Sequence, residues 1–564
     1  MNGKLLPVRR LWPWALAAFL AAGATFAAAI PSGFVFDDEF FIERNLHLRD
    51  WSGLPRIFNE SMTAGSGMPS NFYRPLQAAT HFLDARLWGT APGAAPGHHL
   101  TSVLLHGCAA AAVFLWLAGF FAPAAALAAA LLYALHPLHA EAVDYISGRG
   151  DTLSILFVAT GLAAFRLYPA FGLGCAALAL LSKENAVMFP VLLLLSEWAA
   201  GRPIAWRRHF PFWLLAAAYT GLRITVLNFS GTLNFYGAER NIFTDNFIYR
   251  LYTYLATLPL SLRLWLWPSD LHHERSFSVH VNFLLPGVVG SALGCLAIFG
   301  AGWLLRRESR VLLAAAAFYL AATLPTSNLL AIINALFYDH WFLLPGLGLA
   351  LLAAKVFSRF EPRNLIVMAA PLAGLLAGLT QGYHPVWRDG AALNTHILRY
   401  EPGNAKAHHN LAMALADRGR KQEAMEHYRQ AIAAGGRYPE THHNLGELHG
   451  AAGDLEAAAA EYRRALELNP AFHHSLRALG ALEMQRGHLN EAEACLLKAA
   501  ELQPEAPDTW LLLAELYTRA NRPERVPAAL RTGSERTRDP RFAAELRRRA
   551  AQNVSGNAGA PNKR

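Results

Sequence analysis

The stretch Phe34–Phe40 reads FVFDDEF and follows an apolar segment that ends near Ile30. Two adjacent aspartates, Asp37 and Asp38, therefore lie a few residues outside an expected membrane-spanning helix. Carboxylates cost little in such a place only when water, a cation or a substrate faces them. The same residues could instead cap the next helix, because Asp is a favoured N-cap residue. The rest of the chain bears on the choice between a functional site and a helix boundary.

The composition is that of a membrane protein. Of the 564 residues, 54% are apolar and 16% are charged, whereas a soluble globular protein carries about 25% charged residues. The net charge of +9 does not indicate nucleic-acid binding, because the basic residues that matter flank apolar runs, as membrane orientation requires. Three of the four cysteines fall inside apolar runs, so neither a disulfide framework nor a zinc site is predicted.

Apolar runs that could cross a membrane recur up to about residue 382, and each crossing needs roughly 20 residues. Segment 11–30 has features of a signal peptide, but we interpret it as a retained span because many more follow. Segment 247–267 contains Arg250 and Arg263 and is interpreted as an interfacial or re-entrant helix. We predict about 11 spans: 11–30, 99–121, 122–138, 151–168, 169–182, 185–200, 209–228, 283–305, 310–326, 338–357 and 364–382.

Basic residues near the span ends set the predicted orientation, because they favour the cytoplasmic side. The N-terminus is then cytoplasmic, and the C-terminal part lies outside the cell (inner) membrane, in the periplasm. The polar, aromatic-rich loops share the outer face, which suggests chemistry there and not a pore. The cytoplasmic basic residues would be Arg9, Arg10, Arg202, Arg207, Arg208, Arg306, Arg307, Arg310, Lys355, Arg359 and Arg363.

Four groups of polar residues on this predicted outer face are candidates for chemistry. Arg74, after Tyr73, could bind phosphate or simply pair with an acid at the interface. Lys183 and Glu184 separate two short apolar runs, where they could bind a ligand or form a plain salt bridge. Asp339 and His340 could supply an acid or only an aqueous cap at the start of a span.

The run from His136 to Asp151 is the densest of these groups. His136, His139 and Glu141 could ligate a metal, but no H-E-x-x-H pattern is present and a zinc protease is not expected. The same residues suit phosphate contact or proton transfer, with Arg149 and Asp151 close behind. They could also form a satisfied polar turn between helices.

The order of these motifs resembles a known family. F-D-D, Y-R-P-L, H-P-L-H-A-E-A-V-D-Y-I-S-G-R-G-D and L-S-K-E-N occur in that order, as in the transmembrane and TPR repeat-containing O-mannosyltransferases of the GT-C superfamily, of which this chain looks like a bacterial relative. The resemblance implies that Asp37 and Asp38 form the catalytic signature. Relatives tend to have Glu-His-Arg where this chain has Asp339-His340-Trp341, which puts donor specificity in doubt.

After Gln381 the composition changes, and a 34-residue period begins near Gly403. This is the tetratricopeptide (TPR) pattern. The predicted architecture is all-α: a GT-C-type membrane domain over 1–385 with an outer loop at 31–98, a linker at 386–402, TPR repeats over 403–551 and a disordered tail at 552–564. The repeat positions are His408, His442, Leu476 and Trp510; Leu411, Leu445, Leu479 and Leu513; and Ala424, Ala458 and Ala492.

Stacked helix pairs form a groove that suits a peptide or protein partner. Polar residues near the start of each first helix could line it, or could be ordinary surface polarity. They are His409, Asn410, His443, Asn444, His473 and His474. Their spacing follows the repeat and is not a metal-ligand pattern.

Together, the resemblance and the topology predict an inverting glycosyltransferase in the lipid bilayer, with a polyprenyl-phosphate-linked sugar as donor. Asp37 or Asp38 would be the base, and four basic side chains would face the phosphate: Arg74, His139, Arg149 and Lys183. A divalent cation could assist, although the sequence demands no metal. The alternatives are a transporter with a periplasmic adaptor and a membrane-anchored TPR scaffold; paired internal repeats expected of a transporter are not evident in the sequence, and an anchor needs only one span.

Overall fold

A computed structural model describes residues 8–68, 70–226, 242–304, 310–333, 335–537, 539, 541–542 and 544–545. The described residues form helices, turns and loops and include no strand, which confirms the all-α prediction. The chain divides into two compact units, Met1–Glu401 and Pro402–Arg564. Each unit is described by itself.

The helices of the first unit coincide with the predicted apolar segments, and segment 247–267 becomes α12. Four of them, α5, α8, α13 and α16, begin at a proline, which is favoured at the first helical position because it lacks an N–H that would otherwise be unpaired. The helices are α1 (Val8–Phe26), α4 (Ala95–Ala118), α5 (Pro123–Ala134), α7 (Arg149–Ala164), α8 (Pro169–Ser182), α9 (Phe189–Ala199), α10 (Trp206–Thr225), α12 (Phe247–Leu266), α13 (Pro286–Leu304), α14 (Arg310–Thr323), α15 (Leu343–Phe357) and α16 (Pro362–Tyr383).

Within the described residues, four helical segments are long and apolar enough to cross a membrane: Arg10–Ala29, Pro92–Ala118, Asp339–Phe357 and Pro362–Trp387. A fifth is possible if Pro123–Ala134 and Pro137–Val143, which bend by 53°, form one span. Others are shorter than predicted. Helix α9 has 11 residues, or about 16 Å at 1.5 Å per residue, against a hydrocarbon core of about 30 Å. Predicted cytoplasmic residues Arg306 and Arg307 lie outside the described residues.

Several helices carry apolar side chains on their outer surface. In α16, Ile366, Val367 and Leu375 are 66%, 70% and 58% exposed, and α13 exposes Leu293 and Leu296 in the same way. Monomeric soluble proteins rarely expose contiguous apolar surface of this kind. The long apolar helices and their exposed faces therefore fit a membrane protein.

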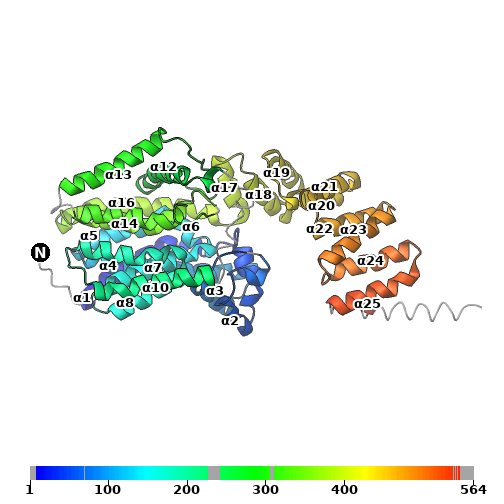
Figure 1. Ribbon diagram of the computed structural model, residues 1–564, viewed down its shortest axis with the longest axis horizontal. Coiled ribbons are helices and arrows are strands. Elements are labelled where there is room, and N and C mark those ends of the chain that lie inside the picture. The colour runs from blue at the N-terminus through cyan, green and yellow to red at the C-terminus, as the bar shows by residue number, and fades with distance from the viewer. Residues whose placement is uncertain are drawn as a thin grey trace, which may run out of the picture. The chain divides into compact units, whose positions relative to one another are not determined.

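Small residues let the central helices pack closely. Helices α4, α7, α8 and α10 lie side by side (Figure 1). A Cβ at Gly107 of α4 would lie 2.8 Å from the ring of Phe19, and one at Gly161 of α7 would lie 2.8 Å from the ring of Phe189. Small residues at helix contacts are how membrane helices approach each other without a hydrophobic driving force.

The predicted outer loop is a compact layer of short helices. They are η2 (Glu39–Glu43), η3 (Leu46–Leu48), η4 (Trp51–Gly53), α2 (Leu54–Ile57), η5 (Ala64–Ser66) and α3 (Pro75–Leu87). They share a small core in which Phe41, Ile42 and Leu48 pack with Phe82 of α3 and with Ile146. The acidic stretch is thus fixed on packed hydrophobic residues.

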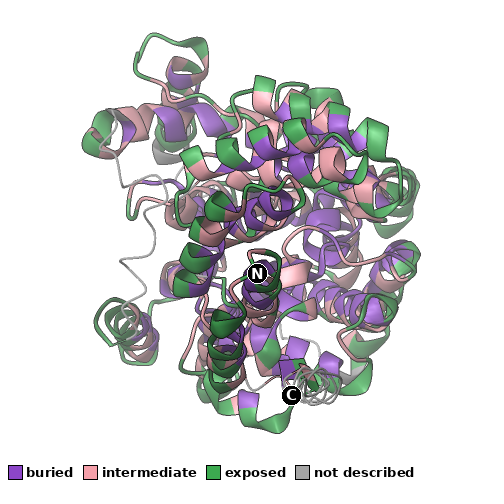
Figure 2. Cartoon of the chain, turned by 90° about the vertical axis from the view of Figure 1, so that its right-hand side faces the viewer, coloured by how far each residue is buried: buried purple, intermediate pink, exposed green. Residues whose placement is uncertain are grey.

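The second unit consists of paired helices: α18 (Ala405–Asp417) with α19 (Lys421–Ala433), α20 (Pro439–Ala451) with α21 (Leu455–Leu468), α22 (His473–Gln485) with α23 (Leu489–Leu502), and α24 (Pro507–Arg519) with α25 (Val526–Thr537). Gly419, Gly453 and Gly487 have positive φ at the turn within each pair, and Asn521 takes that place in the fourth pair. Single helices alternate between buried and exposed residues, as Figure 2 shows. The predicted TPR repeats are therefore present.

The predicted linker 386–402 contains a helix, α17 (Gly390–Tyr400), which the Asp389 side chain caps through the backbone N–H of Ala392. Leu393 and Ile397 of α17 are buried within the first unit. The division between the units therefore falls at Glu401 and Pro402, because this stretch has apolar residues at helical spacing and can bury them. The predicted disordered tail 552–564 lies outside the described residues.

Candidate active site

The acidic stretch is tied down through Asp38. The Asp38 side chain is fully buried; its Oδ1 accepts hydrogen bonds from the Ser147 backbone N–H at 2.8 Å and the Ser147 hydroxyl at 2.5 Å, and its Oδ2 accepts one from the Val35 N–H at 3.1 Å. Burial raises the pKa of Asp38 to about 7, although the hydrogen bonds from Ser147 and Val35 act in the opposite direction. Asp38 therefore fastens this loop to the 136–151 segment.

Asp37 is half-buried and is directed differently from its neighbour. The preceding residue, Phe36, has a φ of 54°, a left-handed conformation that is uncommon for an aromatic residue and often marks a functional site. The Phe36 ring packs edge-on against Tyr145 and His273, with centroids 6.1 and 4.9 Å away. The Tyr145 hydroxyl interacts with the Asp37 carboxylate. A strained residue thus places one carboxylate among aromatic rings.

Glu141 connects three segments beside these rings. Its Oε1 accepts hydrogen bonds at 2.6 Å from His273 Nδ1 and from His340 Nδ1, and its Oε2 accepts one at 3.2 Å from the His340 backbone N–H. The His273 ring is stacked on Tyr338 at 5.3 Å. One buried carboxylate therefore fixes the orientation of two imidazoles, in the way that a carboxylate bound to one ring nitrogen orients a catalytic histidine.

Asp339 and Asp144 also have fixed partners in the same region. Asp339 accepts hydrogen bonds from Arg275 Nε at 3.2 Å and from the His272 backbone N–H at 3.3 Å. Asp144 Oδ2 lies 2.5 Å from His384 Nδ1. The predicted outer-face segments 31–98 and 136–151 are thus in direct contact through Asp38 and Ser147, and Glu141 joins 136–151 to His273 and His340.

A second group of charges, which we call the basic cluster, comprises Arg74, Lys183 and Arg223. Arg74 binds Glu184 through two hydrogen bonds, Nη2 to Oε1 at 2.7 Å and Nε to Oε2 at 3.0 Å, and Arg223 Nη1 lies 3.9 Å from Glu184 Oε2. Lys183 Nζ lies 2.5 Å from Asp151 Oδ2. Three cations against two carboxylates leave an excess of one positive charge, which suits an anionic ligand.

Burial would raise the pKa of Glu184, but the charge of Arg74 and its hydrogen bonds hold the pKa below its ordinary value. Glu184 is therefore ionised and keeps the Arg74 guanidinium in place. Arg74 also lies over the Phe72 ring, 4.7 Å from its centroid. These contacts orient Arg74 before any ligand arrives.

Arg149 is placed differently from what the sequence indicated. It is fully buried; its Nη2 lies 2.7 Å from Asp84 Oδ2 and donates to the His98 carbonyl at 2.8 Å, and its Nε donates to the Ser102 hydroxyl at 3.1 Å. A buried guanidinium must be paired in this way. All these partners are protein groups, so Arg149 holds helices together. This geometry does not favour its predicted role at the donor phosphate.

His136 and His139 lie in the helix packing. His136 Nδ1 accepts from the Leu138 N–H at 3.2 Å, and its Nε2 lies 3.1 Å from the Trp265 carbonyl, so protein groups contact both nitrogens. The His139 ring packs against Tyr133 at 4.7 Å and His106 at 4.9 Å. These contacts place neither histidine in the basic cluster.

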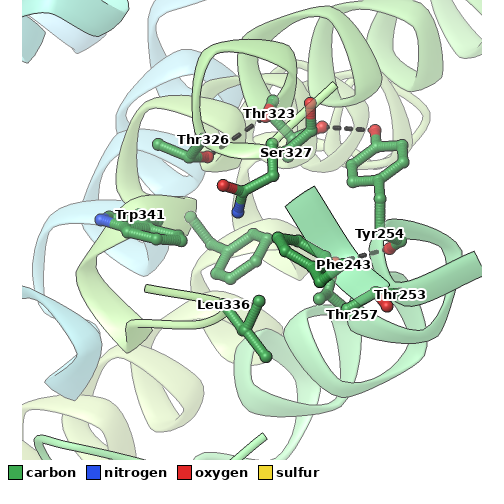
Figure 3. Close-up of a pocket in the computed structure, with 11 residues that line it drawn as sticks. Phe243, Thr253, Tyr254, Thr257, Thr323, Thr326, Ser327, Leu336 and Trp341 are labelled. Atoms are coloured by element: carbon green, nitrogen blue, oxygen red, sulfur yellow. Dashed lines mark hydrogen bonds between the residues drawn. The ribbon is translucent and has the colours of Figure 1, made fainter. Parts of the chain in front are cut away.

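A small pocket lies between α12 and the segment around η11 (Leu324–Thr326), and Figure 3 shows its hydroxyl groups and the rings of Trp341 and Phe243. The hydroxyls are already bonded: Tyr254 to Thr323 at 2.7 Å and Thr326 to the Thr323 carbonyl at 3.1 Å. We interpret it as a polar seam in the helix packing, because these hydroxyls are engaged and the described lining residues include no carboxylate, imidazole or amine.

In the second unit, the predicted groove residues connect successive repeats. His409 Nδ1 lies 2.8 Å from the Thr441 hydroxyl, and His443 Nδ1 lies 3.1 Å from the Ser475 hydroxyl, one repeat further on. Asn444 donates to the Tyr428 hydroxyl at 3.1 Å. His473 and His474 pack against each other, with ring centroids 4.0 Å apart, and Asn410 is half-buried.

Sequence reasoning missed several residues of the site. His273 and Arg275 belong to the run Leu271–Arg275 (LHHER), which follows the aromatic end of α12. The density of charged and imidazole groups in five residues on the predicted outer face was an available signal. Ser147 and Arg223 had no such signal, because a lone serine in a turn and a lone arginine near a helix end are ordinary.

The fold and the site define a class: a polytopic helical membrane protein with a TPR unit, whose membrane part gathers carboxylates, imidazoles and basic residues where its loops meet. The tetratricopeptide repeat family matches residues 405–435 and 439–472. A solved TPR protein described as having an unusual peptide-binding site, YrrB, is 18% identical over 32% of this chain and 89% of its own, with a TM-score of 0.26.

The curated relatives extend over the membrane part. A protein O-mannosyl-transferase of Caenorhabditis elegans is 27% identical over 452 residues, 74% of this chain and 62% of its own length. Protein O-mannosyl-transferase TMTC4 of Mus musculus is 28% identical over 480 residues, 72% of this chain and 64% of its own. The chain thus spans about three fifths of these relatives. They confirm the resemblance: over nearly three quarters of its length the chain is a homologue of proteins named O-mannosyl-transferases.

Proposed function

We propose that the chain is an inverting membrane glycosyltransferase that moves a sugar, mannose by analogy with its relatives, from a polyprenyl-phosphate donor to an acceptor hydroxyl. The observation that carries the proposal is the placement of Asp37: a half-buried carboxylate on a loop that Asp38 and Ser147 anchor, next to Tyr145 and directly after Phe36, whose ring packs against His273. Relatives named protein O-mannosyl-transferases over most of the chain support the sugar.

In the proposed reaction Asp37 takes the proton from the acceptor hydroxyl. The hydroxyl oxygen attacks the anomeric carbon as the bond from that carbon to the phosphate oxygen breaks, and the polyprenyl phosphate leaves with the bonding electrons. A single displacement inverts the anomeric configuration. Asp38 is the positioning residue of the pair, because its two oxygens already accept hydrogen bonds from Ser147 and Val35.

The basic cluster would receive the charge that grows on the leaving phosphate. The planar guanidinium of Arg74 suits phosphate, and Lys183 and Arg223 add positive charge beside it. Charged groups that are held in place before the reaction stabilise a transition state most effectively, because they need little reorganisation. The salt bridges to Glu184 and Asp151 hold these basic groups in place.

Glu141 would set the two imidazoles for contact with substrate. With Nδ1–H of His273 and of His340 donated to the same carboxylate, each ring turns its opposite edge away from Glu141. We assign these rings to binding of the sugar hydroxyls or the phosphate. Asp339, held by Arg275, would stabilise the loop that carries His340.

We place this site at the outer face of a cell inner membrane, with the N-terminus cytoplasmic and the TPR unit periplasmic. Positive residues at the predicted inner ends support this orientation. The repeats would bind a protein or peptide acceptor, with His409, His443 and Asn444 near the first helices of the pairs.

The test is mass spectrometry of periplasmic proteins from cells with the full-length gene, without it, and with residues 403–551 deleted. We expect hexose-modified serine or threonine peptides that disappear without the gene. The deletion should spare hydrolysis of the lipid-linked donor but strongly reduce modification of protein acceptors. Unchanged glycopeptides in the gene-free cells would overturn the proposed function, and unchanged modification by the deletion variant would overturn the acceptor role of the repeats.

A further inference from the structure

The segment His272–Ser276 contacts the proposed active site through two of its side chains. His273 Nδ1 lies 2.6 Å from Glu141 Oε1, and Arg275 Nε donates to Asp339 Oδ1 at 3.2 Å. The residues beside these two contact a different element, the C-terminal end of α17. The segment is therefore held by two sets of contacts, and only one of them belongs to the site described above.

Tyr400 and Glu401 at the end of α17 make the second set of contacts. The ring of His272 is stacked on that of Tyr400, with centroids 4.8 Å apart and 9° between the planes. Glu401 Oε1 accepts a hydrogen bond from the Ser276 backbone N–H at 2.9 Å and lies 3.4 Å from His272 Nε2. Both residues belong to the first unit, so these contacts lie within it.

The backbone just before the segment is fixed as well. The Leu271 carbonyl accepts a hydrogen bond from the Tyr383 hydroxyl at 2.9 Å and lies 2.8 Å from His396 Nε2 of α17. Because a carbonyl only accepts, His396 Nε2 carries the proton of that bond. The chain therefore enters the segment tied to both α16 and α17.

The backbone conformation shows why such support is needed. Asp270 and Glu274 have φ values of 53° and 58°, which are left-handed conformations that are uncommon for residues other than glycine. Conformations of this kind persist only where the surrounding structure holds them, and they cluster at functional sites. The contacts from α17 supply part of that restraint.

Glu401 is charged where it makes these contacts. Its side chain is 20% exposed. Burial would raise the pKa of Glu401, but hydrogen bonds from Ser276 and His272 hold this pKa below its ordinary value. An ionised carboxylate accepts a backbone N–H more strongly than a neutral group does, so the bond to Ser276 is a firm one.

We propose that Tyr400 and Glu401 are positioning residues of the proposed active site, because by holding His272 and Ser276 they set the place of the His273 ring between them. This inference rests on the proposed function, in which the His273 ring contacts the donor. Neither Tyr400 nor Glu401 touches the reacting groups, and both act through the segment that they hold.

The position of Glu401 in the chain adds a consequence. Only Pro402 and Gly403 separate it from Asn404, whose side chain caps the first repeat helix, α18, through the backbone N–H of Ala407. The chain therefore enters the repeats directly from the residues that hold the active-site segment. Residues 401 and 402 remain when 403–551 are deleted, so that deletion keeps the proposed positioning contacts.

The first measurement is KM for the lipid-linked donor in the purified full-length protein. Glu401→Ala should raise this KM about tenfold, because displacing a positioned group by about 1 Å costs up to about 10²-fold. A loss of folded protein would lower the apparent kcat and leave KM unchanged. Glu401→Gln should restore most of the affinity, because its amide oxygen still accepts the Ser276 N–H.

The matched control is Asp454→Ala. Asp454 also accepts a backbone N–H through its carboxylate, from Ala457 at 3.0 Å, but it does so in the repeat unit, and its removal should leave the donor KM unchanged. A double-mutant cycle then shows whether Glu401 acts through His273. In protein that already carries His273→Ala, adding Glu401→Ala should change KM by less than about twofold.

Hydrogen exchange measured by mass spectrometry tests the contacts without any sugar transfer. Peptides that cover residues 271–277 should exchange faster in Glu401→Ala and in Tyr400→Ala than in the wild type, because the Ser276 amide and its support are released. Asp454→Ala should leave the exchange of these peptides unchanged.

A donor KM in Glu401→Ala equal to that of the wild type would overturn the proposal, and so would fully additive effects of Glu401→Ala and His273→Ala. If Glu401→Ala does not fold, Tyr400→Ala, which changes a side chain that is 43% exposed, takes its place in each measurement. Wild-type protein that transfers no sugar would overturn the proposed function instead. Hydrogen exchange would then still decide the contact, and unchanged exchange in the variants would contradict it.

Discussion

The two units of the chain differ in how far their ion pairs are buried. The first unit buries several of its ion pairs: the side chains of Arg149 and Asp84 are 0% and 3% exposed, and those of Lys183 and Asp151 are 7% and 3% exposed. The repeat unit keeps most of its pairs in water, as with Arg464 and Glu467 at 66% and 61%. Glu483, which three basic residues surround, is an exception.

This difference in burial shows where charged residues have a specific structural role. Burying a charge pair costs several kcal/mol of desolvation for each ion, which the attraction between them barely offsets, while an exposed pair contributes about 0–1 kcal/mol and costs little. A chain that only needed stability would place apolar residues at the buried positions. The buried pairs instead hold particular loops in particular orientations, and those loops carry Asp37, Glu141 and Arg74.

The largest expected effect is on the rate of transfer. Asp37→Asn keeps the side-chain size but removes the base, and loss of a general base typically lowers a rate by about 10²–10⁴. The rate of sugar transfer by the purified variant is compared with that of Glu39→Gln, whose carboxylate two residues away pairs with Arg44 at 2.5 Å and should be dispensable. Full activity of Asp37→Asn would move the search for the base to Glu141, Asp151 and Asp339.

A second prediction contrasts the two kinds of ion pair directly. Arg149→Met leaves Asp84 as a buried, uncompensated charge, which should destabilise the first unit by about 3–5 kcal/mol. Arg464→Met removes a partner of the same chemistry from the repeat surface and should cost less than about 1 kcal/mol. Thermal unfolding of both variants in detergent measures the contrast, and equal losses would show that burial is not what distinguishes the units.

The third prediction separates binding from chemistry. Arg74→Met removes the proposed phosphate fork, and a charged hydrogen bond is worth about 1.5–3 kcal/mol, so KM for the lipid-linked donor should rise about ten- to hundredfold. The matched control is Arg202→Met, because Arg202 pairs with Glu197 at 2.8 Å beyond the far end of α9. An unchanged KM in Arg74→Met would remove the basic cluster from the donor site.

The smallest effect expected is on the pH dependence of stability. Since burial raises the pKa of Asp38 from 3.8 to about 7, the folded protein keeps this proton at pH values where the unfolded chain has lost it. The stability contributed by the protonated group is therefore present below the unfolded pKa and is lost as the pH rises through the folded pKa. Asp38→Asn should remove this slope. The unfolding temperature of the variant should therefore rise relative to that of the wild type between about pH 5 and about pH 8; a constant difference would contradict the shift.

Much of the fold was predictable because it depends on local patterns. Apolar run lengths located α1, α4, α15 and α16, and the 34-residue period located the repeats. Which acid and base form an ion pair was harder to predict from the sequence. Arg74 with Glu184 and Lys183 with Asp151 join residues separated by 110 and 32 positions, and nothing in the sequence says which acid a given arginine meets.

The same limit explains the two main differences at the site. Arg149 looked like a phosphate ligand because it lies in the densest motif, but its partner Asp84 comes from α3, where a single aspartate on an ordinary helix gives no signal. His273 lies in a run of charged and imidazole groups that gives a signal but no partner, and only the fold brings it within 2.6 Å of Glu141. Residue type and spacing predicted the segments of the site, and tertiary packing decided the role of each side chain.

The central claim is that the site around Asp37 transfers a sugar to a hydroxyl. Purified full-length protein in nanodiscs would be incubated with polyprenyl-phosphate mannose and a serine- and threonine-rich peptide library, and the peptides analysed by mass spectrometry and NMR. We expect peptides that gain a hexose with inverted anomeric configuration, and loss of that product with Asp37→Asn. Folded wild-type protein that transfers no sugar to any peptide, or transfer that is equal in Asp37→Asn, would contradict it.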